Sequence, residues 1–254
     1  MMLNNRAFSL VELSVTLIII GLLAVGIVAG SRLLNTTALN KDISNLEKYK
    51  TSVVSFISTY SQYPGDFAKA AQFFGNNCLG DNGGSDICSG DGDGLIESPA
   101  EFSKFWLHLK AANIVNPEFT ISSSSTPTDE DIFPKTNYDN YGRYAAHHYS
   151  SFSRKSGSSL DIAVAERNYL VVGGLDIAAD VSNMPLLGNL LPKDALRYDK
   201  KIDDAHPSEG NLIAFIGSNY APLGVSGSCL TDLATYANYE NSKTCVLAYK
   251  LDRF

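Results

Sequence analysis

Proline is absent from the first 63 residues of this 254-residue chain, and the first one is Pro64. Because an internal proline kinks or ends a helix, its absence leaves room for one long helix before Pro64. A clustered excess of lysine and arginine is also missing, since the formal net charge is −7. Nucleic-acid binding usually depends on such a basic cluster, so a DNA or RNA partner is not expected.

The sequence also lacks the short motifs of common catalytic sites. It has no Gly-x-Ser-x-Gly elbow, no P-loop and no His-Glu-x-x-His pair. The adjacent His147 and His148 would point to opposite faces of a strand, so they could not share a metal ion. We therefore expect no enzyme activity, and no cofactor apart from the calcium considered below.

Cysteine is scarce, and its four copies form two local pairs. Cys78 and Cys88 share one polar segment, and Cys229 and Cys245 share another. None has the Cys-x-x-Cys spacing of zinc and redox sites. In an oxidising compartment each pair would form a disulfide. The alternative is four reduced cysteines in a cytosolic protein.

The chain does contain a long apolar run near its start. Residues 8–30 read FSLVELSVTLIIIGLLAVGIVAG, and Glu12 is the only charged residue among them. As a helix this run would be long enough to cross a bilayer. A cleaved secretory signal would have a shorter apolar region. A plain membrane anchor would leave Glu12 unexplained, because a carboxylate in hydrocarbon costs about 2.5 to 3.5 kcal/mol.

The residues around Glu12 indicate which kind of membrane segment this run is. The string Arg6-Ala7-Phe8-Ser9-Leu10-Val11-Glu12-Leu13 resembles the cleavage motif of type IV prepilins and type II secretion pseudopilins. The resemblance implies that a prepilin peptidase removes a leader, residues 1–7, by cutting between Ala7 and Phe8, and that the new Phe8 amine is methylated. The family usually has glycine where this chain has Ala7, which puts the efficiency of cleavage in question.

The same resemblance implies how the protein is used. After cleavage, the carboxylate of Glu12 can neutralise the Phe8 α-amino group of a neighbouring subunit, which assigns both residues to filament assembly. The implied partners are the prepilin peptidase, other pilins or pseudopilins and an inner-membrane assembly platform. The implied location is the bacterial inner membrane, with the C-terminal domain in the periplasm, followed by a pilus or pseudopilus filament. The competing hypothesis is a periplasmic binding or enzymatic domain on an uncleaved signal anchor.

Helical periodicity continues after the apolar run. Over residues 31–63 apolar side chains recur every three or four positions, which predicts an amphipathic continuation of the first helix. They are Leu39, Ile43, Leu46, Tyr49, Val53, Ile57 and Tyr60. The alternative is two helices with a hinge near Asn35-Thr36-Thr37.

The remaining residues, 64–254, are predicted to form a globular domain. Asp66 is a candidate N-cap for a short helix over 67–74, and Ser98 with Glu101 forms a capping box for another. Strands are expected at 141–149, 169–175, 212–216 and 246–251. Loops or short helices separate these strands, which favours an antiparallel meander. The fold class is therefore α+β and pilin-like: a long N-terminal helix packed on an antiparallel sheet.

Two acidic segments lie in this domain. Asp81, Asp86, Asp91 and Asp93 lie in a glycine-rich loop that could bind Ca²⁺, although the spacing departs from that of an EF-hand. The alternative is a solvated loop. The second segment, residues 192–210, resembles a charged motif of some pilin-like proteins, with Ala205 where the motif has glycine. We expect it to form a short helix and a turn whose acids pair with its lysines on the surface.

Overall fold

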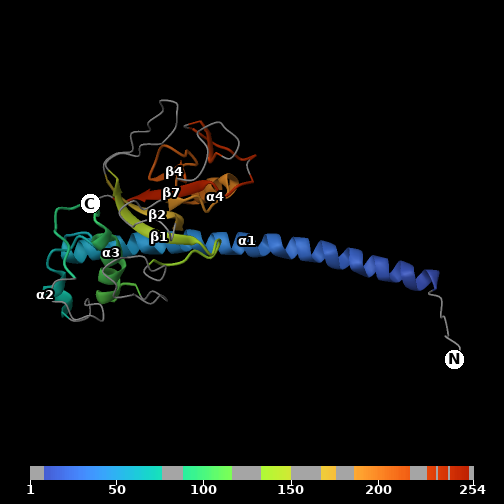
Figure 1. Cartoon of the computed structure of the whole chain (residues 1–254), viewed down its shortest axis with the longest axis horizontal. Helices are drawn as coiled ribbons and strands as arrows, with labels where there is room; N and C mark the ends of the chain where they lie inside the picture. Colours follow the sequence, from blue (N-terminus) through green and yellow to red (C-terminus); the bar gives the residue numbers. More distant parts are fainter. Residues whose placement is uncertain are drawn as a thin grey trace.

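One long helix carries a globular domain around its C-terminal half (Figure 1). The computed structural model describes residues 9–75, 88–115, 133–149, 167–175, 186–217, 228–232, 234–239 and 241–251. In Figure 1 the N-terminal half of the helix extends away from the domain. The predicted α+β class is confirmed: the long helix packs with an antiparallel sheet.

Helix α1, Leu10–Tyr60, is continuous over 51 residues, about 75 Å at 1.5 Å per residue. The alternative of a hinge near Asn35 was wrong. The helix ends at Ser61, which adopts the left-handed conformation with φ of 58°. From Leu39 onward the predicted apolar stripe faces the domain, and Leu39, Leu46 and Val53 are buried.

The main sheet is antiparallel throughout, in the order β1-β2-β7-β4, with β3 pairing on β2. A separate two-stranded sheet joins β5 to β6. The four predicted strands are present, and β3, β5 and β6 were not predicted. The bounds are β1 Gly142–Tyr149, β2 Arg167–Leu175, β3 Leu186–Leu187, β4 Leu212–Ile216, β5 Leu230–Asp232, β6 Thr235–Tyr236 and β7 Cys245–Lys250.

Three shorter helices complete the described elements: α2 Ala70–Phe74, α3 Pro99–Ala111 and α4 Pro192–Ile202. The capping box before α3 is confirmed, because Ser98 and Glu101 bond each other's backbone N–H groups. The predicted N-cap Asp66 was wrong. Helix α2 begins later, with Lys69 at its N-cap position, and Asp66 instead binds a distant loop.

The core lies between α1, α3 and one face of the main sheet. Tyr49 of α1 makes edge contacts with Trp106 of α3 and Tyr144 of β1, at ring distances of 4.8 and 5.0 Å. Helix α3 contributes its large apolar side chains Phe102, Phe105, Trp106 and Leu109 to this core, and all four are buried. The other sheet face carries a second buried apolar cluster: Tyr169, Val171, Ile213, Phe215, Val246 and Ala248.

One predicted disulfide is present. Cys229 and Cys245 are bonded and lie 16 residues apart in the sequence, so the bond ties the β5 segment to the start of β7. Cys88 is buried. Its predicted partner Cys78 lies outside the described residues, so that pairing stays a prediction.

Candidate functional site

The start of α1 has a complete capping box. Ser9 is the N-cap, and its side-chain oxygen accepts from the Val11 N–H at 3.3 Å. In return, the Ser9 N–H donates to Oε2 of Glu12 at 2.9 Å. The sequence Ser9-x-x-Glu12 fits the usual Ser/Thr-x-x-Glu pattern of a capping box, so this local signal could have predicted the helix start. Glu12 therefore stabilises its own helix start, in addition to any role between subunits.

The first half of α1 has no cover from the domain. Every described side chain from Leu10 to Thr37 is exposed. The helix is long and apolar enough to cross a membrane, and none of its most apolar 18-residue window is buried. An exposed apolar surface of this length needs lipid or other protein around it. Ala7 and Phe8, the predicted cleavage residues, lie outside the described residues.

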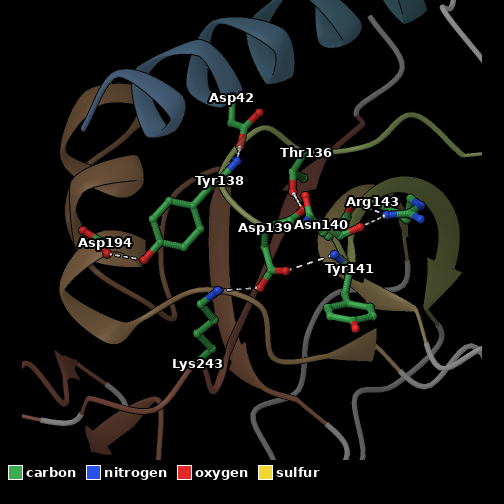
Figure 2. Close-up of polar contacts among 10 residues, drawn as sticks. Asp42, Thr136, Tyr138, Asp139, Asn140, Tyr141, Arg143, Asp194 and Lys243 are labelled. Carbon is green, nitrogen blue, oxygen red and sulfur yellow. Dashed lines mark hydrogen bonds and ion pairs between the residues drawn. The ribbon is translucent and has the colours of Figure 1, made fainter. Parts of the chain in front are cut away.

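The second half of α1 is joined to the domain by a buried carboxylate, Asp42 (Figure 2). It accepts from the Asn137 backbone N–H at 2.7 Å, from Asn137 Nδ2 at 2.7 Å and from the Tyr138 N–H at 2.8 Å. The backbone oxygen of Asp42 also accepts from the Tyr144 hydroxyl at 3.1 Å. Asp42 thus holds the loop before β1 against a single turn of α1.

The same loop is bonded to α4 and to the segment before β7. Tyr138 donates from its hydroxyl to Asp194 at 2.6 Å, and Lys243 pairs with Asp139 at 2.8 Å (Figure 2). Burial, and then the hydrogen bond to Asp194, raise the pKa of the Tyr138 hydroxyl, so it stays protonated as a donor. Asp194 also pairs with Arg197, on the next turn of α4, at 3.0 Å.

These contacts correct the prediction for residues 192–210. The helix is present, but its acids do not pair with its own lysines at the surface. Asp194 and Asp199 are buried and accept from the hydroxyls of Tyr138 and Tyr236, respectively. The sequence could have indicated this burial, because residues three or four positions apart share one face of a helix. Asp194 lies on the same face as the buried Tyr198, and Asp199 lies on the same face as the buried Ala195.

Comparison with protein families gives one match, at the exposed start of α1. The family described as "Prokaryotic N-terminal methylation motif" matches residues 2–28. The chain carries a prepilin-type signature. This signature indicates a type IV pilin-like protein that a prepilin peptidase processes, and it covers the predicted cleavage site and Glu12. No curated protein and no solved structure matches the chain.

Beyond the end of α1, the domain brings three carboxylates together. Asp91 and Asp93, both predicted as calcium ligands, lie with Asp66, and one oxygen of each lies within 4.8 Å of the others. Asp66 is buried, and it accepts from the N–H groups of Gly92 at 2.7 Å and Gly94 at 2.8 Å. Burial raises the pKa of the Asp66 carboxyl, and these two N–H bonds oppose the shift.

Calcium binding to this cluster stays a prediction. Asp81 and Asp86, the other two predicted ligands, lie outside the described residues. Asp66 was missed because it lies 25 residues before Asp91 in the sequence. Calorimetry of the purified chain with CaCl₂ tests the site: heat release that Asp93→Asn abolishes would support it, and no heat with an unchanged melting temperature would contradict it.

A second acidic group in the described residues, Asp199, Asp203 and Asp204, binds the chain itself. Asp203 accepts from the Leu212 N–H at 2.9 Å, and Asp199 accepts from the Ala205 N–H at 3.2 Å. These bonds shape the turn after α4. Burial raises the pKa of Asp199 to about 6, and the bond from Tyr236 opposes the shift.

Two of the four histidines, His108 and His147, pack inside the domain. His108 accepts from the Gly65 N–H at Nδ1 and lies 2.7 Å from the Cys88 oxygen at Nε2. His147 stacks on Phe102 at 4.5 Å. Among the described residues, neither group of three potential metal ligands includes a histidine.

Proposed function

We propose that the chain is a filament subunit, a pilin, minor pilin or pseudopilin, of a type IV pilus or type II secretion system. The observation that carries the proposal is the methylation motif at residues 2–28 on a helix whose apolar first half has no cover. In a filament, the corresponding helices of neighbouring subunits would supply that cover. Before assembly, the inner membrane would supply it, with the domain in the periplasm.

Cleavage is the first event to test. Mass spectrometry of the protein from cells that contain its prepilin peptidase should find a chain that begins at N-methylated Phe8. Ala7→Gly should be cleaved at least as completely, since glycine is the usual residue of the family at this position. A chain that still begins at Met1 would contradict the proposal and favour an uncleaved anchor.

The role of Glu12 in assembly follows from its charge. After cleavage, its carboxylate would neutralise the Phe8 amine of a neighbouring subunit in an apolar filament core, where an unpaired charge is costly. The same carboxylate accepts from the Ser9 N–H, so Glu12→Ala would remove both the charge and the cap. The two effects need separate variants.

Three variants separate charge from capping. Glu12→Gln keeps a side chain that can close the capping box but has no charge. Ser9→Ala removes the N-cap side chain and keeps the charge. We expect Glu12→Gln and Glu12→Ala to block incorporation into filaments, and Ser9→Ala to assemble almost normally. Normal assembly of Glu12→Gln, together with failure of Ser9→Ala, would assign Glu12 to helix capping alone.

A further inference from the structure

A hollow of about 240 Å³ lies where α1 meets the end of β7. Its apolar walls include Val53 and Ile57 of α1 and the ring of Tyr249 of β7. Its polar residues are Lys50, Lys250 and Asn211. The hollow is far along α1 from the methylation motif, so it is a surface of the domain and not of the membrane-spanning segment.

The two lysines give this hollow a positive charge. The Lys50 Nζ atom lies 4.4 Å from the centre of the Tyr249 ring, and Lys250 donates to the backbone oxygen of Gly210. Neither forms an ion pair with any carboxylate in the part of the chain that the structure describes. Two ammonium groups beside apolar walls fit an anionic segment that also carries an apolar side chain.

Such a segment exists on the chain itself, at residues 90–97, which we name the acidic turn. The side chains of Asp91, Asp93 and Glu97 are exposed, and Leu95 between them is half-buried. None of the three carboxylates forms an ion pair with a described residue. The turn is held in shape by Asp66, which binds the N–H groups of Gly92 and Gly94. Little conformational freedom would therefore be lost on binding.

We propose that the acidic turn of one copy docks on the lysine-lined hollow of a second copy. The two surfaces differ, so the contact is heterologous, and repeating it produces an open chain of subunits unless the rotation closes a ring. The inference deepens the filament proposal and rests on it for its biological setting. The contact is a lateral interaction between domains, separate from the pairing of Glu12 with Phe8.

The test is self-association of the purified full-length chain in detergent micelles, measured by sedimentation. EDTA is present throughout, because a cation on Asp91 and Asp93 would cancel their charge. We expect association at an ionic strength of about 10 mM, and much weaker association at about 300 mM, where exposed charges are screened. The variants K50E/K250E and D91K/D93K should each weaken association by about tenfold or more.

The decisive measurement is the charge exchange. A chain with all four substitutions should associate within about threefold of the wild type, because opposite charges again face each other. Lys41→Glu, an exposed position on α1 away from the hollow, is the matched control and should associate like the wild type. Circular dichroism checks that each variant is folded. If K50E/K250E does not fold, Lys250→Gln replaces it in the association measurement.

Three results would overturn the contact. The wild-type chain could stay monomeric at low salt, or K50E/K250E and D91K/D93K could associate normally. In the third, the chain with all four substitutions would be folded but would not regain association. Failure of the filament proposal is distinguishable. If Phe8 is methylated but the charge variants associate like the wild type, only this contact is contradicted. An uncleaved chain with a restored charge exchange removes only the filament proposal.

Discussion

Ala205, in the turn after α4, has a φ of 70°, in the left-handed region that a Cβ atom disfavours. The related motif of pilin-like proteins has glycine at this position, which pays no such cost. We therefore expect Ala205→Gly to raise the free energy of unfolding by about 0.5 to 1 kcal/mol, even though glycine gains freedom in the unfolded chain. Urea unfolding of the purified chain measures the change.

Asn113 supplies the control for this substitution. It also has a positive φ, 54°, but asparagine tolerates the left-handed region better than alanine does. Asn113→Gly should therefore give a clearly smaller gain than Ala205→Gly. An equal gain at both positions, or a loss at Ala205, would show that φ does not limit stability there.

His108 makes the domain sensitive to acid. Burial lowers the pKa of His108 from 6.5 to about 4, and its Nδ1 must stay unprotonated to accept from Gly65. Because the unfolded chain binds this proton more tightly, the contribution of His108 is complete above pH 6.5 and is lost as the pH falls towards 4. We expect a loss of about 2 kcal/mol from this group between about pH 7 and pH 5.

A variant isolates this contribution from the other titrating groups. His147 shifts in the same direction as His108, whereas the raised pKa values of Asp66 and Asp199 lower stability as the pH rises. His108→Gln should be less stable at pH 7 than the wild type, and the difference should shrink by about 2 kcal/mol at pH 5. A difference that is independent of pH would contradict the role of His108.

At the scale of elements, Asp42 sets how α1 meets the rest of the domain. Asp42→Ala would leave two backbone N–H groups and one side-chain N–H group without their acceptor. We expect the free energy of unfolding to fall by about 3 kcal/mol, because unsatisfied donors at a partly buried site are costly. Thermal and urea unfolding measure it. Lys41→Ala, one residue earlier and exposed, should change it by no more than about 0.5 kcal/mol.

Most elements could be predicted from the sequence, because their signals are local. The apolar stripe of α1, the capping box at Ser98 and the four long strands each depend on residues close together in the chain. The short strands β3, β5 and β6 carry too few residues for a pattern. Asp42 could not be found in this way, since Asn137 lies 95 residues further along the sequence. The same reason explains why Asp66 was assigned to a nearby helix instead of to Gly92 and Gly94.

At the scale of the molecule, the exposed half of α1 should be dispensable for folding of the domain. No described side chain before Leu39 is buried, whereas Leu39, Asp42, Ile43 and Leu46 are. A chain that begins at Asn35 should therefore be soluble without detergent and melt within about 3 °C of the full chain. Circular dichroism and gel filtration test this.

A second truncation gives the contrast. A chain that begins at Glu47 lacks those four buried residues, so its melting temperature should be at least about 10 °C lower. Equal melting of both truncations would mean that the α1 residues from Leu39 to Leu46 contribute little to the core. Unfolding of the chain that begins at Asn35 would mean that the apolar half also supports the domain.

The position of Asp42 also has a mechanical consequence. A pull on the N-terminal end of α1 travels along one unbroken helix and meets Asp42 within the first turns that contact the domain. One carboxylate there holds three N–H groups of the loop before β1, so the load is divided among several bonds at a single level. Tension would therefore pass from α1 into the edge strand β1 through this loop, before it reaches the aromatic core.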